Sequence, residues 1–156
     1  MTEVEKLWAH YLDSLPKEAP KPARYYEAFA FGTSPESATE LAALVKAGIK
    51  TATGSLAWSY EHDRKPLPRP GDLSIVLDGG GTPVCLIETT EIRIIPFSQV
   101  DPQFAFDGGE DDRSLASWRE GYWTYIIAEC NRIGRSPTPD VPMVCERFRL
   151  VDSNPS

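Results

Sequence analysis

The chain has 156 residues, of which 41% are hydrophobic and 10% aromatic, and this length and composition suit one folded domain with a hydrophobic core. Its formal net charge of −7 disfavours tight, non-specific binding to long nucleic-acid duplexes, because such binding depends on a basic surface. No apolar run approaches the length of a membrane span, and the N-terminus lacks the basic and apolar regions of a secretory signal, so we expect a cytoplasmic protein without a membrane partner.

The N-terminal part of the chain is predicted to form one helix and one strand joined by a connector. Apolar residues follow helical spacing over residues 4–15, and a proline ends the pattern. Prolines in residues 16–24 favour an extended connector, and residues 25–31 then alternate large and small side chains as a strand does. We therefore divide the chain into an N-terminal helix with its connector, residues 1–24, and a main domain, residues 25–152.

A capped helix follows and leads into a second strand. Ser34 and Pro35 suit the first positions of a helix, and Gly48 suits its C-terminal cap. From residue 51 the chain changes to small and β-branched residues, which predict a strand over residues 51–59. Lys50 therefore lies where the helix ends and the strand begins, a position at which scaffolds often present working groups.

Hydroxyl groups follow Lys50 along this strand. Thr51 and Thr53 are expected on one face, and Ser55 continues the polar run. An ordinary solvated lysine near a helix C-terminus is the simpler interpretation of Lys50. The small, hydroxyl-bearing residues behind it favour a polar pocket instead. Its position at the junction gives Lys50 access to the cleft, so its loss should abolish activity with little loss of stability.

The middle of the chain is predicted to be β-structure. Residues 62–70 form a polar loop with three prolines, in which Arg64 is a candidate for contact with a phosphate group, although an ordinary solvated loop is the alternative. Residues 73–77 and 84–95 flank a glycine-rich turn, and this pattern predicts a hairpin.

The C-terminal third is predicted to contain an irregular segment, a long helix and a closing strand. Residues 97–112 are irregular and acidic, and Ser114 then caps a helix that ends before Gly134. Residues 143–151 form the last strand. Short strands without regular alternation of strands and helices predict an α+β fold, a small mixed β-barrel with flanking helices, whose strands form one curved sheet.

Three aromatic residues outside the main helical stripes are candidates for stacking a nucleobase. They are Phe31, Trp58 and Trp123. Single-strand binding proteins hold bases on aromatic rings beside a basic cleft. Packing in the core is the alternative for each of the three.

The chain offers no evident metal site. Cys85, Cys130 and Cys145 show no paired short spacing, and His10 and His62 are far apart. This distribution predicts buried thiols rather than disulfides or a structural metal site. We expect no cofactor, and the sequence does not decide whether a divalent ion is needed.

The run Gly48-Ile49-Lys50-Thr51-Ala52-Thr53 resembles the signature of the ASCH domain (activating signal cointegrator homology), a family related to PUA domains. Further segments match the family in order: Phe31–Pro35, Pro70–Asp72, Ile87–Glu91, Asp112–Arg119 and Val144–Phe148. The resemblance extends from about Tyr26 to Val151. It implies a PUA-like β-barrel with a cleft beside it, and a role in RNA or nucleotide chemistry.

The resemblance implies two possible activities. Some bacterial members look like ribonucleases that act on single-stranded RNA, whereas shorter members are amidohydrolases that remove the acetyl group from N4-acetylcytidine with a lysine, a threonine and a glutamate. Matched to this sequence, these residues are Lys50, Thr53 and Glu110, with Asp111 as the alternative acid. The greater length of this chain and its strand at residues 52–56 favour the ribonuclease. The alternatives are the amidohydrolase and a non-catalytic module that binds RNA or a modified nucleotide.

Each activity assigns these residues different work. For amide hydrolysis, Thr53 attacks the acyl group, Lys50 in its neutral form accepts the threonine proton, and Glu110 serves the leaving amine. For RNA cleavage, the Lys50 ammonium stabilises charge on the phosphate, while Glu110 or Thr53 accepts the proton of the 2′-hydroxyl.

Overall fold

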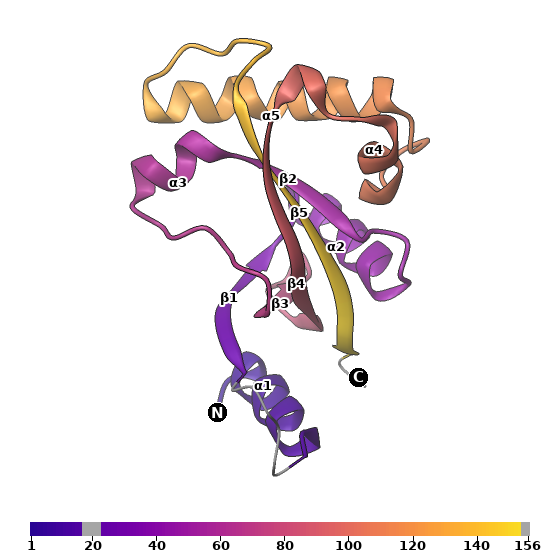
Figure 1. Ribbon diagram of the computed structural model, residues 1–156. Coiled ribbons are helices and arrows are strands. Elements are labelled where there is room, and N and C mark those ends of the chain that lie inside the picture. The colour runs from indigo at the N-terminus through magenta and orange to yellow at the C-terminus, as the bar shows by residue number, and fades with distance from the viewer. Residues whose placement is uncertain (17–22, 154–156) are drawn as a thin grey trace.

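The structure is a computed structural model and describes residues 1–16 and 23–153 (Figure 1). Most of the predicted connector, residues 17–22, lies outside the described residues. In chain order the elements are α1 (Glu3–Ser14), β1 (Arg24–Ala30), α2 (Pro35–Lys46), β2 (Ala52–Leu56), α3 (Ala57–Asp63), β3 (Asp72–Leu77), β4 (Pro83–Pro96), the 3-10 helix η1 (Phe97–Gln99), α4 (Pro102–Gly108), α5 (Leu115–Ile133) and β5 (Pro142–Ser153). The predicted α+β fold is confirmed.

The described strands form one five-stranded sheet in the order β1-β3-β4-β5-β2. Strands β1 and β3 are parallel, and the other neighbouring pairs are antiparallel. The long strands β4 and β5 are visibly curved in Figure 1. The four strands expected in one curved sheet therefore do share it, and β1 and β2 form its two edges.

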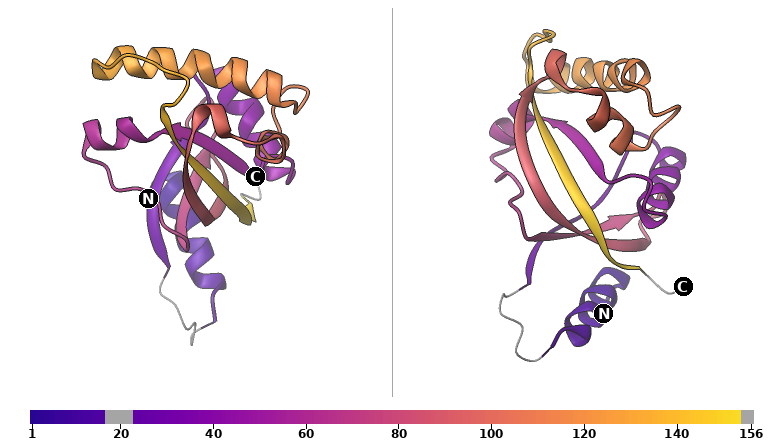
Figure 2. Two further views of the ribbon diagram at one scale, coloured as in Figure 1. Left: turned by 45° about the horizontal axis from the view of Figure 1, so that its top comes forward. Right: turned by 45° about the vertical axis from the view of Figure 1, so that its right-hand side comes forward.

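Helices cover the sheet on several sides and complete the core. Helix α5 packs through Trp118 and Ile126 onto a cluster that includes Met143 of β5. Helix α2 contributes Val45 to a second cluster with residues of β3 and β4, and α1 contributes Leu7 to a third. Both views of Figure 2 place α5 and α1 at opposite ends of the molecule.

Two predicted segments differ from the structure. The strand expected over residues 51–59 ends at Leu56, and α3 follows at once. The pairing of β2 with β5 ends at the pair Leu56–Met143, because the next residue of β5 in this direction, Pro142, has no N–H group to extend the ladder. In addition, residues 57–63 contain no β-branched side chain that would favour a strand. The segment expected to be irregular, residues 97–112, contains η1 and α4, because Asp101 caps α4 and a proline follows it.

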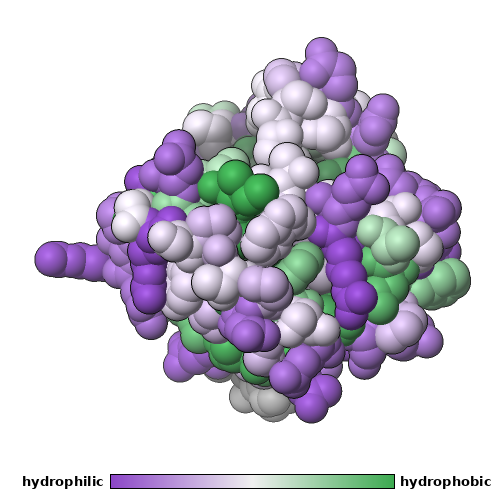
Figure 3. Space-filling model, turned by 90° about the horizontal axis from the view of Figure 1, so that it is seen from above, coloured by the Kyte–Doolittle hydropathy of each residue, from purple (hydrophilic) through white to green (hydrophobic). Residues whose placement is uncertain are grey.

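The surface on the α5 side is largely hydrophilic. Figure 3 shows this face, where the hydrophobic areas are small and separated. One of the exposed large hydrophobic residues on α5 is Ile127. Among the helices of residues 1–16 and 23–153, none is long and apolar enough to cross a membrane.

Candidate functional site

Lys50 lies in the turn that joins α2 to β2, as predicted. Gly48 ends α2 with a φ of +78°, in the left-handed region that favours glycine. The amide nitrogens of Ile49 and Lys50 then donate to the Leu44 carbonyl at 3.0 and 3.1 Å, which turns the chain towards β2. The side chain of Lys50 is only 1% exposed, so it is a buried residue and not a solvated one.

The ammonium group of Lys50 is fully hydrogen-bonded. Its Nζ donates to the carbonyl oxygens of Ala52 and Gly108 at 2.9 and 3.2 Å, and to Oε2 of Glu110 at 2.9 Å. A lysine ammonium has three N–H donors, so these bonds use all of them. The same nitrogen lies 5.2 Å from the centre of the Phe31 ring. Because the Glu110 side chain is 34% exposed, the buried lysine is linked to the protein surface through this carboxylate.

The loop after α4 holds Glu110 against this turn. The amide nitrogen of Thr51 donates to the Asp107 carbonyl at 2.9 Å. Gly109 has a φ of +72°, and a Cβ atom at this position would lie 2.8 Å from the Ile49 carbonyl oxygen. Such a contact is too close for any side chain, so only glycine lets the loop approach closely enough to bring Glu110 to Lys50.

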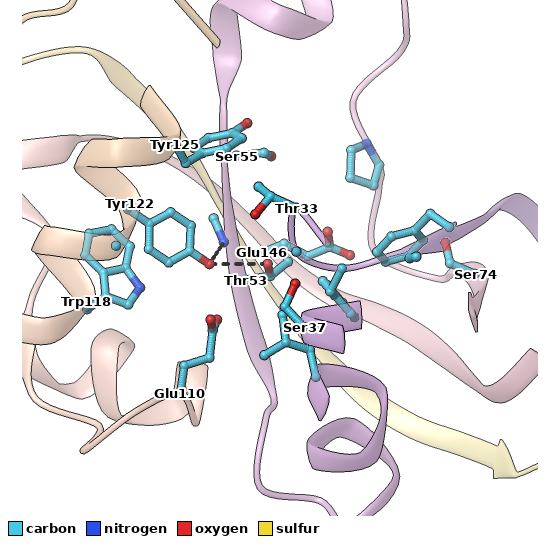
Figure 4. Close-up of a pocket in the computed structure, with 18 of the residues that line it drawn as sticks. Thr33, Ser37, Thr53, Ser55, Ser74, Glu110, Trp118, Tyr122, Tyr125 and Glu146 are labelled. Atoms are coloured by element: carbon cyan, nitrogen blue, oxygen red, sulfur yellow. Dashed lines mark hydrogen bonds between the residues drawn. The ribbon is translucent and has the colours of Figure 1, made fainter. Parts of the chain in front are cut away.

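A pocket of about 450 Å³ opens between the two edge strands and α5 (Figure 4). Aromatic residues form much of its wall: Tyr26, Phe31, Tyr60, Trp118, Tyr122 and Tyr125. Its carboxyl groups are those of Glu27, Glu110, Asp111 and Glu146. Within the described part of the chain, no lysine or arginine lines the pocket. The volume is typical of a site for a small molecule.

Tyrosines of α5 cap the free edge of β2 at the pocket wall. The amide nitrogens of Gly54 and Leu56 donate to the hydroxyl oxygens of Tyr122 and Tyr125, at 3.1 and 3.0 Å. The Tyr122 hydroxyl also lies 3.5 Å from Oγ1 of Thr53. Burial raises the pKa of Tyr125 to about 12, so its hydroxyl stays protonated. These contacts satisfy the edge of the sheet and hold Thr53 in the pocket wall.

Trp118 lies on the same wall and carries an unused donor. Its ring packs between two glycines, since Cβ atoms built at Gly54 and Gly108 would lie 3.5 and 3.6 Å from it. Its indole Nε1 is buried and has no hydrogen-bond partner among the described residues. A buried donor without a partner carries a desolvation cost.

Glu146 of β5 is a pocket residue that the sequence did not identify as functional. It is paired in register with Thr53 of β2, so the two side chains lie on one face of the sheet. Its Oε2 accepts a hydrogen bond from the Thr89 hydroxyl at 2.6 Å. Burial raises the pKa of Glu146, with the charges of Glu27 and Asp72 acting in the same direction. The available signal was a single acid that follows three apolar residues, Met143 to Cys145, on the closing strand.

Comparisons with known proteins agree with this fold. The family model of the ASCH domain matches residues 27–152. The chain belongs to the ASCH family. The crystal structure of an ASCH domain from Lactobacillus crispatus JV V101 matches with a TM-score of 0.91 and 30% identity, over 96% of this chain and 94% of that chain.

A second solved structure extends the family match. It is a protein from Enterococcus faecalis V583, with a TM-score of 0.85 and 32% identity over 97% of this chain and 89% of that chain. A comparison with curated proteins gave no match. The ASCH resemblance and the PUA-like α+β fold expected from the sequence are therefore confirmed.

The ASCH domain brings part of the predicted site together. Four of the predicted residues line the pocket: Phe31, Thr53, Ser55 and Glu110. Lys50 lies beside it and is linked to it through Glu110. The alternative acid, Asp111, also lines the pocket, but the ion pair with Lys50 is made by Glu110. The geometry therefore favours Glu110 as the acid that acts with the lysine.

Two predicted polar residues lie away from the pocket. Strand β2 begins at Ala52, so Thr51 directly precedes it, and its hydroxyl donates to the Asp107 carbonyl oxygen at 3.4 Å. Arg64 is the exposed C-terminal cap of α3, with a φ of +53°. Neither residue lines the described pocket.

Two predicted aromatic residues pack elsewhere. Because residues 57–63 are helical, Trp58 is carried onto α3, where the guanidinium of Arg135 lies 3.7 Å from its ring centre. Trp123 packs against Phe97 with the ring centres 5.7 Å apart. Core packing, the alternative stated for both, is what the structure contains.

The remaining reactive groups are the three cysteine thiols and the side chains that could bind a metal ion. Cys85, Cys130 and Cys145 are free and buried, as predicted. Burial raises the pKa of Cys85 to about 12 and that of Cys145 to about 11, so both remain protonated thiols. Within residues 1–16 and 23–153, no group of three or more histidine, cysteine, aspartate or glutamate residues is placed to hold a metal ion.

Proposed function

We propose that this ASCH protein is an amide hydrolase that acts on a small, neutral, nucleoside-like substrate, for which N4-acetylcytidine is the test compound. The observation that carries the proposal is the pocket, with the Thr53 hydroxyl and the Glu110 carboxylate in its wall and no cation in its described lining. Fixed negative charge repels phosphates, whereas a neutral ligand meets no such repulsion. Aromatic walls suit a flat ring.

The contacts of Lys50 support a different assignment of the catalytic base from the one expected from the sequence, which was Lys50 itself. With its three N–H groups donating to Ala52, Gly108 and Glu110, the lysine has no lone pair to accept a proton. Glu110 enters the pocket as a carboxylate held by this lysine (Figure 4). We therefore assign the base to Glu110 and the positioning of that base to Lys50.

The proposed reaction has two stages. Oγ1 of Thr53 attacks the acyl carbon and forms a C–O bond, while its proton passes to Glu110. Glu110 then gives this proton to the leaving amine nitrogen as the amide C–N bond breaks, which leaves an acyl ester on Thr53. A water molecule, activated by the Glu110 carboxylate, hydrolyses the ester and returns the proton to Thr53.

The ribonuclease alternative requires a phosphate beside Lys50. That lysine is 1% exposed and already paired with a carboxylate, and the pocket in front of it is acidic. These observations favour the amidohydrolase over the nuclease. They also favour the amidohydrolase over a module that only binds RNA.

Thr53→Val and Glu110→Gln provide the decisive comparison with the wild type. Each purified protein is incubated with N4-acetylcytidine and, separately, with labelled single-stranded RNA. We expect the wild type to release cytidine, and each variant to lose at least about 100-fold in kcat/KM, as is usual when a positioned proton-transfer group is removed. The matched control is Thr124→Val, because Thr124 lies on the exposed face of α5 outside the pocket; it should keep full activity.

The two substrates separate the alternatives. Cleavage of RNA by the wild type, lost in Glu110→Gln and without deacetylation, would overturn the proposal in favour of the nuclease. Binding of cytidine without any hydrolysis would overturn it in favour of a binding module. Unchanged hydrolysis in Thr53→Val would remove Thr53 as nucleophile.

A further inference from the structure

The pocket has a second polar end that the proposed reaction does not use. Figure 4 shows Glu110 and Glu146 on opposite sides of Thr53. Glu110 is paired with Lys50, whereas Glu146 accepts a hydrogen bond from Thr89, a residue that is 2% exposed. Among the described residues, no lysine, arginine or histidine forms an ion pair with Glu146. Lys65, whose charge acts on Glu146, is held by Glu27 at 2.6 Å.

The titratable groups that face Glu146 come from several elements. They are Tyr26 and Glu27 of β1, Asp72 of β3, Tyr60 of α3, and Lys65 of the following loop. Two of them are acids, and the single cation is engaged by one of those acids. Burial raises the pKa of Glu146, and the charges of Glu27 and Asp72 act in the same direction, whereas the hydrogen bond from Thr89 and the charge of Lys65 lower it. The net direction is upward, so the proton of Glu146 is held more firmly than that of an exposed glutamate.

We propose that Glu146 is a specificity-determining residue, whose protonated carboxyl group donates a hydrogen bond to an acceptor on the ring of the ligand. This inference rests on the proposed function only for the identity of the pocket as a nucleoside site. A cytosine ring presents two such acceptors, its carbonyl oxygen and its ring nitrogen. A ligand that fills the pocket also excludes water, which further favours the neutral carboxyl group.

The position of Glu146 fits this role. Its register with Thr53 puts its side chain beside the reacting hydroxyl, on the face that lines the pocket. A ring whose acyl group reaches Thr53 therefore lies within range of the Glu146 side chain. The hydrogen bond from Thr89 uses one lone pair of one carboxyl oxygen, so the other oxygen can carry the proton to the ligand.

The test measures binding of cytidine by titration calorimetry, which does not depend on catalysis. If Glu146 must be protonated, the wild type takes up protons on binding, and its affinity falls by up to about tenfold per pH unit above the pKa of this group. Glu146→Gln carries a permanent N–H donor of the same shape, so it should bind at least as tightly and without proton uptake. Glu146→Ala should bind at least about tenfold more weakly. Glu120→Gln, on the exposed face of α5, should behave as the wild type does.

Each result decides the inference. Weaker binding by Glu146→Gln, with wild-type affinity that rises with pH, would mean that the ionised carboxylate accepts a hydrogen bond from the ligand, and would overturn it. Affinity that is independent of pH, or no cytidine binding at all, would also overturn it. If the wild type fails to hydrolyse N4-acetylcytidine but shows the expected pH-dependent binding, the proposed function fails and the role of Glu146 stands.

Discussion

The ammonium group of Lys50 has three hydrogen-bond partners with different roles. Two backbone carbonyls fix the direction of Nζ, and only the third partner, Glu110, is a titratable group that reaches the pocket. An ion pair with one buried and one partly exposed member differs from a surface pair, because the buried charge has no access to water. The lysine therefore serves both the fold and the site.

Replacing Lys50 should cost stability as well as activity, contrary to the expectation for a solvent-accessible lysine. Lys50→Met keeps the length of the side chain but leaves two carbonyls and Glu110 without their donor. We expect a loss of about 2 kcal/mol in the free energy of unfolding, less than for a fully buried pair because Glu110 can turn to solvent. Urea denaturation measures the loss, and hydrolysis of N4-acetylcytidine should be abolished.

The double variant Lys50→Met with Glu110→Gln is the control for this prediction. It removes the unpaired charge, so it should recover part of the stability and none of the activity. Additive losses in the cycle would show that the ion pair contributes nothing. Partial activity in Lys50→Arg would contradict the role of Lys50 in orienting a base and would favour stabilisation of a phosphate, since arginine offers a permanent charge but a different geometry.

The protonation of Glu146 should be visible in stability as well as in binding. Its folded-state pKa is raised, so its protonated form favours the folded state; the contribution is present at low pH and is lost as the pH rises through the raised pKa. We expect Glu146→Gln to match the melting temperature of the wild type at about pH 4 and to melt at a higher temperature than the wild type at about pH 8. Thermal denaturation of both proteins between these two pH values tests this prediction. A difference that is constant with pH would contradict the assignment, and Glu120→Gln should show none.

At the scale of elements, two turns that end in left-handed glycines meet to build the site. Gly48 directs α2 into β2, and Gly109 directs α4 into the loop that carries Glu110. The close approach of Gly109 to the Ile49 carbonyl makes one turn depend on the other. A change in either turn should therefore move the Lys50–Glu110 pair.

Gly109→Ala should disrupt the site much more than the same change at Gly134. Both glycines have similar left-handed conformations, φ +72° and +76°, so each substitution carries the same intrinsic cost of about 1–2 kcal/mol. An added Cβ atom at Gly109 also meets the Ile49 carbonyl at 2.8 Å, whereas at Gly134 nothing lies within 4 Å. We expect greater destabilisation and at least about tenfold lower kcat/KM for Gly109→Ala alone. Equal effects of the two variants would show that the loop does not depend on this contact.

Signals confined to a few neighbouring residues were predictable from the sequence, and contacts between distant segments were not. The helix ends at Ser34, Ser114 and Gly134 were predictable, because a helix cap is a local hydrogen-bond arrangement. The end of β2 depends on Pro142, far along the chain. The place of Glu146 beside Thr53 depends on the same pairing. A single-residue shift in register would have put Glu146 on the other face.

At the scale of the whole molecule, the pocket and the N-terminal helix occupy different regions of one sheet. Helix α5 lies at one end and α1 at the other in both views of Figure 2. The pocket is lined mainly by α5, β1 and β2, with Ser74 of β3 and Glu146 of β5, whereas the buried residues around Leu7 of α1 are Leu73 and Ile75 of β3 and Leu86 of β4. Stability and substrate binding should therefore be separable by mutation.

Leu7→Ala tests this separation. Leu7 is 4% exposed and packs with Leu73, Ile75 and Leu86 at the α1 end of the sheet. Removing a buried leucine side chain costs about 2–5 kcal/mol through lost burial and the cavity left behind. We expect a loss in this range by urea denaturation, with KM for N4-acetylcytidine unchanged at temperatures where the variant is folded. Leu12→Ala is the matched control on the same helix, because Leu12 is 43% exposed and should cost less than about 1 kcal/mol. If Leu7→Ala raised KM in the folded protein, α1 would be coupled to the pocket through β3 and β4, and the two ends of the sheet would have to be treated as one functional unit.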